Sequence, residues 1–220
     1  MSKWSLHWLE AGGSLRPWRR IIETDIATAR SRCAAVVTLP RLDVLIQRGD
    51  GIAGLGLMGM SHRADLISLM LDPRMPEMEA SLARGMLAQI TAHEVNHSLR
   101  MAHGLLETHL GGRVIAEGLA DHFVQQLFPE ALPAPWTEPL SAGETAELLP
   151  RFARERHEWQ PQDSVWLHGG KGFPHWVGYR LGFALVGNFL APRPALRAHH
   201  LIDHHTDKIL NAVLPGPQGS

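Results

Sequence analysis

The sequence predicts an α+β protein with a small sheet followed by a mainly helical part. Apolar runs of strand length occur only early in the 220 residues, whereas segments with helical periodicity fill most of the remainder. Hydrophobic residues make up 45% of the chain and charged residues 20%, as in an ordinary globular protein. A chain of this size buries roughly 70% of its unfolded surface. It therefore needs no disulfides, in keeping with its single cysteine, Cys33.

The early part predicts one helix and a small sheet. Apolar residues recur at helical spacing over 15–35, which predicts the first helix. Two short apolar runs, 42–47 and 65–71, have strand length, although the second also fits a helix. Between them, 54–59 matches G-x-G-x-x-G. No repeated βα pattern surrounds this match, so we interpret it as a turn leading into an edge strand and not as a nucleotide site.

Helical patterns dominate the later part. The segment 77–102 carries an apolar stripe with acidic residues in its first turn, and it predicts one long helix. A second helix is expected over 112–128, before Pro129.

Three further helical signals follow. Residues 141–144 have the Ser-x-x-Glu form of a capping box, although Pro150 is expected to interrupt the helix. Two more helices are predicted over 176–190 and 195–213. We expect a single domain over 1–220, with the helix and small sheet in 1–75 and a mainly helical part in 76–220.

Charge and hydropathy exclude several classes of partner. Lys and Arg number 21 against 22 Asp and Glu, so no basic excess favours nucleic acid or an anionic membrane. The first 13 residues lack the apolar stretch of a secretory signal. The most apolar later run, 181–191, is shorter than the roughly 20 residues that span a bilayer. We expect a soluble cytoplasmic protein with no nucleic-acid or membrane partner.

Residues 93–97 read H-E-V-N-H, an H-E-x-x-H motif inside the predicted helix 77–102. Positions four apart share one face of a helix, so His93 and His97 can bind one Zn²⁺. Glu94 then lies beside the metal, where it can act as general base toward a metal-activated water. Composition gives about 0.05 chance copies of the motif, which leaves an ordinary pair of helix histidines open as the alternative.

A second pattern, downstream of the H-E-x-x-H motif, makes a chance occurrence of that motif less credible. Glu117 follows His97 after nineteen residues and starts the pattern E-G-L-A-D, which ends at Asp121. His93, His97 and Glu117 form a His₂Glu set, which suits a catalytic zinc with one position open. Asp121, one turn beyond Glu117, is the candidate to accept the free N–H of a ligand histidine.

These motifs resemble the gluzincin metallopeptidases. The runs E-G-L-A-D-H-F at 117–123 and G-Y-R-L-G-F-A-L-V at 178–186 are similar to a family of bacterial predicted zinc-dependent proteases, long classed as a domain of unknown function. The resemblance extends from about residue 42 to the C-terminal helices. It implies a compact zincin-like fold with a substrate-binding edge strand, an active-site helix, a glutamate helix and a helical C-terminal part.

Peptidases of this kind need a donor for the oxyanion that develops during water attack. Tyr179, the one tyrosine of the chain, is the candidate, with an ordinary interfacial tyrosine as the alternative. His168 and His175, in the stretch before the predicted helix 176–190, compete for the role. A cluster near the C-terminus offers a second metal site, although solvated side chains are the favoured interpretation; its members are His199, His200, His204 and His205.

The sequence therefore predicts a zinc-dependent peptidase with one catalytic Zn²⁺ and a peptide or protein substrate. A metallohydrolase of another amide is the nearest alternative. A zinc-binding regulatory or chaperone-like module without turnover is a second, which the intact Glu94 disfavours. A histidine-rich metal buffer is a third, and it would bind more than one zinc per chain. Neither sequence preference nor oligomeric state is predicted.

Overall fold

The computed structural model describes residues 3–158 and 164–214. They belong to two compact units that meet in sequence at Gly104 and Leu105. The first unit combines a sheet with helices and the second is helical, so the α+β prediction is confirmed. The prediction of a single domain stays a prediction. In the described part of the chain, no helix is both long and apolar enough to cross a membrane.

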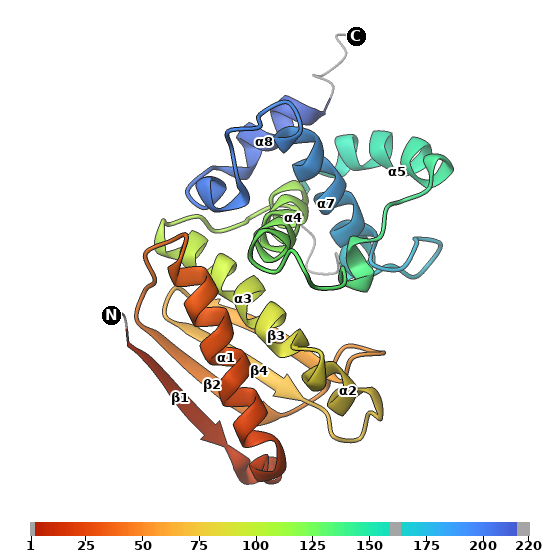
Figure 1. The fold of residues 1–220 in the computed structure, drawn as a ribbon. Helices are drawn as coiled ribbons and strands as arrows, with labels where there is room; N and C mark the ends of the chain where they lie inside the picture. Colours follow the sequence, from red (N-terminus) through yellow and green to blue (C-terminus); the bar gives the residue numbers. More distant parts are fainter. Residues whose placement is uncertain (1–2, 159–163, 215–220) are drawn as a thin grey trace, which may run out of the picture. The chain divides into compact units, whose positions relative to one another are not determined.

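The first unit contains a four-stranded sheet (Figure 1). Its strands are β1 (Trp4–Leu9), β2 (Leu42–Arg48), β3 (Leu57–Arg63) and β4 (Leu66–Leu71). The order is β1-β2-β4-β3. Strands β1, β2 and β4 are parallel, whereas β3 runs antiparallel to β4 and forms an edge of the sheet.

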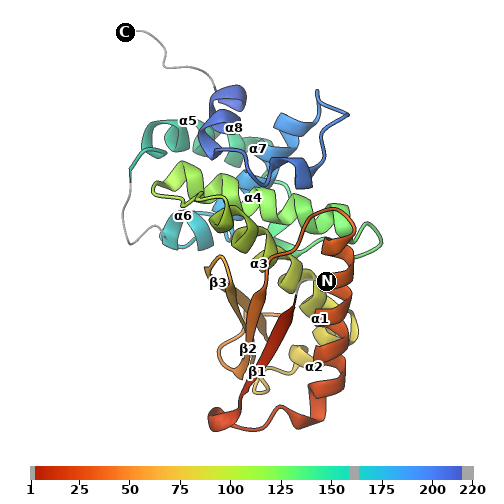
Figure 2. The same ribbon diagram turned by 90° about the vertical axis from the view of Figure 1, so that its left-hand side faces the viewer.

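The register of the strands places alternate apolar residues on one face. Val44 pairs with Ile67 and Ile46 with Leu69, and all four are buried. Two helices, α1 (Arg19–Ala34) and α3 (Met86–Ala102), lie on the same side of the sheet (Figure 2). This side forms the core of the first unit. Most residues of α3 are buried, including several polar ones.

Three predictions for the first unit are wrong in detail. The segment 77–102 forms two helices, α2 (Glu77–Ala83) and α3, because Gly85 adopts φ 71° between them. Only glycine reaches this left-handed conformation without strain, and it turns the chain. The chain was expected to begin with a helix, but the strand β1 precedes the first helix. In β1, apolar Trp4 and Leu6 alternate with polar Ser5 and His7, as is typical of a strand. Both predicted strand runs are strands. The turn expected over 54–59 is wrong in its second half, because residues 57–59 already belong to β3, an edge strand that the sequence did not predict.

The second unit consists of helices around an apolar core. They are α4 (Leu110–Leu127), α5 (Ala142–Glu155), α6 (Ser164–His168), α7 (Val177–Leu190) and α8 (Thr206–Val213). Helices α4 and α7 pack closely at Gly118 and Gly182, where an added Cβ would run into the backbone of the other helix. This contact holds the helix that carries Glu117.

The capping box of α5 is confirmed, since the Ser141 side chain accepts from the Glu144 backbone and the Glu144 side chain accepts from Ser141. Pro150, however, lies inside α5 without ending it. Leu148 and Phe152 on either side are buried, so packing outweighs the lost backbone hydrogen bond.

The predicted helix 195–213 is also wrong as a single element. A 3-10 turn at Ala198–Leu201 and the helix α8 take its place. His205, directly before α8, has an extended backbone with φ −64° and ψ 133°, which separates the two.

Candidate metal centre

The two histidines of the motif lie one turn apart on α3. Their Nε2 atoms are 3.1 Å apart, and their rings meet edge to face with centroids 4.8 Å apart. Ligand atoms around a tetrahedral zinc with bonds of 2.0–2.1 Å are separated by about 3.4 Å. The pair therefore presents two nitrogen donors at a spacing that one ion can bridge. His93 is among the buried residues of α3, whereas His97 is half-buried.

Glu94, between these histidines, is buried with 7% of its surface exposed. Its carboxylate lies beside the edge strand β3, where the Ser61 hydroxyl is 2.9 Å from Oε2. The same hydroxyl is 2.7 Å from the Glu94 backbone oxygen. Sequence reasoning missed Ser61, because a single serine in a strand belongs to no motif.

Glu117 and Asp121 are both buried and lie one turn apart on α4. The Trp136 indole donates a hydrogen bond to Asp121 Oδ1 at 3.0 Å. The Trp136 contact was not foreseen from the sequence, in which fifteen positions separate the two residues. The role of Asp121 as acceptor for a ligand histidine stays a prediction.

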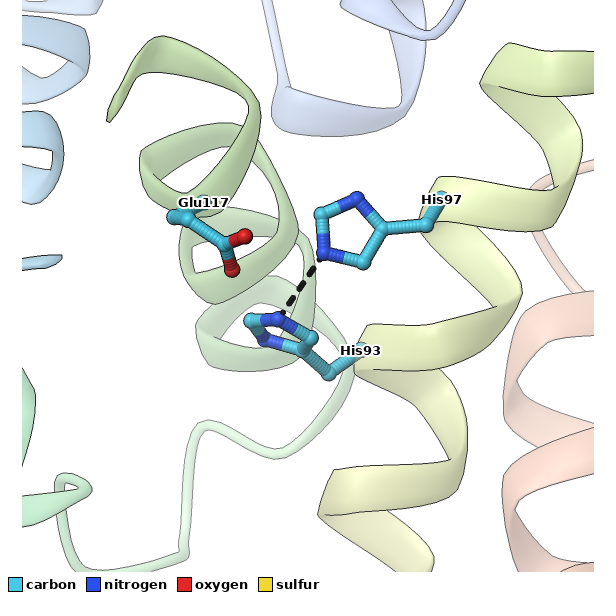
Figure 3. A group of neighbouring side chains, drawn as sticks. All are labelled: His93, His97 and Glu117. Atoms are coloured by element: carbon cyan, nitrogen blue, oxygen red, sulfur yellow. Dashed lines mark hydrogen bonds between the residues drawn. The ribbon is translucent and has the colours of Figure 1, made fainter. Parts of the chain in front are cut away.

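Within residues 3–158 and 164–214, one group of three His, Cys, Asp or Glu side chains could hold a metal ion. Its members are His93, His97 and Glu117 (Figure 3). Each offers one ligand atom, two of them imidazole nitrogens and the third a carboxylate oxygen. This donor set suits Zn²⁺, which accepts both ligand types and favours four-coordinate sites. The residues present therefore fit the metal that the motif predicts.

The three candidates for oxyanion stabilisation lie in the second unit. Tyr179 is half-buried on α7, and its ring centroid is 5.8 Å from that of His168 at the end of α6. Burial lowers the pKa of His168, while the negative charge of Glu117 acts in the opposite direction. His175 packs on Trp176, with ring centroids 4.7 Å apart. Tyr179 and His168 thus lie together, and the choice between the three stays a prediction.

The C-terminal histidines do not form a further group of three metal ligands among the described residues. The rings of His199 and His200 are tilted by 46° to each other, with centroids 3.9 Å apart. His199 Nδ1 is 2.7 Å from the Gln126 side-chain amide, and His200 Nδ1 accepts from the Arg197 backbone. One ring nitrogen of His199 and one of His200 are thus engaged in local hydrogen bonds. This favours solvated histidines over a second metal site.

Comparison with known proteins gives one match. The model of the family described as "Predicted Zn-dependent protease (DUF2268)" matches residues 37–211. This range includes every candidate site residue named above. No curated protein and no solved structure matches the chain.

Proposed function

The chain belongs to the family of predicted Zn-dependent proteases, and on this premise we propose that it hydrolyses peptide bonds with one zinc ion. The observation that carries the proposal is the pair of imidazole nitrogens 3.1 Å apart on α3, in one candidate ligand group with Glu117. His93 and His97 would hold the metal through Nε2, and Glu117 through its carboxylate. A zinc ion bound there supplies Lewis acidity, which lowers the pKa of a water molecule toward about 7.

Glu94 is the proposed general base. Its carboxylate follows a ligand histidine directly in sequence and is buried, where few water molecules compete for its oxygens. Glu94 would accept the proton of the attacking water and return it to the amide nitrogen as the peptide bond breaks. A buried carboxylate with a fixed neighbour suits this shuttle, because its position changes little between the two transfers.

Two further roles complete the proposed mechanism. Asp121 would orient a ligand histidine by accepting its second ring N–H, as carboxylates do in many zinc sites. Tyr179 would donate a hydrogen bond to the oxyanion, with His168 or His175 as alternatives. His168 interacts electrostatically with the candidate ligand Glu117, and Tyr179 lies beside His168, which supports these two as donors. We further propose a peptide or protein substrate and a cytoplasmic location, with no nucleic-acid or membrane partner.

The test combines metal stoichiometry with turnover on the same sample. Elemental analysis of the zinc-loaded protein is expected to give one equivalent per chain, and a mixed peptide library is expected to be cleaved. One equivalent without cleavage would favour the regulatory or chaperone-like module instead. More than one tightly bound equivalent would favour a histidine-rich metal buffer.

A further inference from the structure

The edge strand β3 passes unusually close to the side chain of Glu94. A Cβ added at Gly59 would lie 2.6 Å from Glu94 Cγ and 2.7 Å from its Oε1. It would also lie 2.7 Å from a methyl carbon of Ile90, one turn earlier on α3. Real Cβ atoms do not approach other heavy atoms so closely. Gly59 has no positive φ, so it is the space occupied by Glu94 that calls for glycine here.

The Ser61 hydroxyl contacts Glu94 at two atoms. It lies 2.9 Å from Oε2 and 2.7 Å from the backbone oxygen of the same residue. A hydroxyl has one hydrogen, so its donor is shared between these two acceptors. The contact links the end of a flexible side chain to its own backbone. A glutamate side chain has many rotamers, and fixing one of them costs conformational entropy. The hydrogen bond from Ser61 favours the one rotamer that places the carboxylate beside β3.

Gly59 and Ser61 are two positions apart and therefore share one face of β3. Met60 between them lies on the other face, with 46% of its surface exposed. On the face of β3 toward α3, Gly59 has no side chain and leaves space for the Glu94 side chain. Ser61, two positions later, hydrogen-bonds to its carboxylate.

We propose that β3 positions the general base: Gly59 makes room for the Glu94 side chain, and Ser61 fixes its carboxylate. Ser61 is a positioning residue, since it acts through Glu94. The role of Glu94 as base is that of the proposed function above, whereas the restraint on its conformation stands on contacts in the first unit alone. A purely structural serine would satisfy the Glu94 backbone oxygen and leave turnover unchanged.

The experiment compares three serine variants. Ser61→Ala removes the hydroxyl, and Ser61→Thr keeps it on a residue that strands favour. The matched control is Ser68→Ala, on the neighbouring strand β4, where the hydroxyl is 2.9 Å from His62 Nε2. Ser68 pairs with Met60 and so lies on the opposite face from Ser61.

On a cleaved peptide, Ser61→Ala is expected to lower kcat by roughly 10–100-fold, since a displacement of about 1 Å costs that much. KM and the zinc content are expected to stay unchanged, Ser61→Thr to recover most of kcat, and Ser68→Ala to match the wild type. Unchanged kcat in Ser61→Ala, or an equal loss in Ser68→Ala, would overturn the proposal.

A second readout does not depend on turnover. Crystal structures of the zinc-free variants are expected to show the Glu94 carboxylate displaced or in several conformers in Ser61→Ala, and in one conformer in Ser61→Thr. A single, unmoved Glu94 conformer in Ser61→Ala would overturn the positioning role. If the zinc-loaded wild type cleaves nothing, the peptidase assignment fails, while these structures still decide whether β3 positions Glu94.

Discussion

Asp121 accepts its hydrogen bond from the Trp136 indole through Oδ1, at 3.0 Å. If Asp121 also receives the ring N–H of a zinc ligand, the change Asp121→Asn weakens that contact by removing the negative charge. We expect zinc affinity or turnover to fall by roughly 10–100-fold. Zinc titration against a competing chelator measures the affinity directly.

The matched control for this prediction is Trp136→Phe, which removes the indole donor and leaves the Asp121 charge in place. It is expected to change zinc affinity much less than Asp121→Asn. Equal zinc affinity and equal turnover in Asp121→Asn and the wild type would remove Asp121 from the site.

Asp25 on α1 is a second buried carboxylate, with 7% of its surface exposed. It accepts the backbone N–H of Ala88, and burial raises its pKa from 3.8 to about 6. The folded state therefore favours the protonated carboxyl. The stabilisation of the folded state by protonated Asp25 is fully present below pH 3.8 and is lost as the pH rises through about 6. At neutral pH, the ionised Asp25 costs stability.

The change Asp25→Asn keeps an acceptor for Ala88 and removes the charge. We expect the free energy of unfolding of the variant, measured relative to that of the wild type, to be about 1 kcal/mol higher at pH 7 than at pH 5. Urea unfolding of the zinc-free proteins at both pH values measures the difference. A difference between the two proteins that does not change with pH would contradict the raised pKa.

Among single residues, those in a spaced pattern were predictable from the sequence and those that act alone were not. His93 and His97 are separated by one helical turn, and Glu117 starts the pattern E-G-L-A-D nineteen residues later. Ser61 has no such interval, because its neighbour Glu94 lies 33 positions away and only strand pairing brings it close. Trp136 was missed for the same reason.

Among the elements, Gly85 separates α2 from α3, the helix that carries His93 and His97. It adopts φ 71°, and a Cβ there meets nothing within 4 Å. The change Gly85→Ala therefore introduces backbone strain without a clash. We expect it to lower the free energy of unfolding by about 1 kcal/mol, while zinc stoichiometry stays at one equivalent.

Denaturant unfolding measures this loss, and Gly143→Ala serves as the control. Gly143 also has open space around its Cβ position, but it lies within α5, where alanine is favoured. An equal or greater stability of Gly85→Ala would show that the turn between α2 and α3 needs no left-handed residue.

This junction also shows why element bounds were harder to predict than elements. The apolar stripe of 77–102 continues across Gly85, and a glycine inside a helical pattern is compatible with an unbroken helix. The strand β1 has an alternation of Trp4, Leu6 and Trp8, but three apolar positions are too few to distinguish a strand from an irregular segment. Pro150 shows the reverse, since packing in the core overrode a local signal.

For the molecule as a whole, we expect each of the three proposed ligands to be needed for tight zinc binding. Replacing His93, His97 or Glu117 by Ala leaves two protein ligands, so the equivalent of zinc is expected to be lost on dialysis. Zinc is also expected to raise the melting temperature of the wild type and not that of these variants.

His200→Ala, in the C-terminal cluster, is the control and is expected to retain one equivalent. Retention of a full equivalent by Glu117→Ala would move the third ligand elsewhere, with Asp121 or His122 as the next residues to replace.

Our proposal for this family member is hydrolysis of peptide bonds with Glu94 as the base. The most direct measurement compares turnover of the wild type and Glu94→Gln, both loaded with zinc. Glutamine keeps the size of the side chain and removes the proton acceptor. We expect the variant to keep its zinc content and to lose turnover by roughly 10²–10⁴-fold. Equal turnover of an active wild type and Glu94→Gln would contradict the proposal.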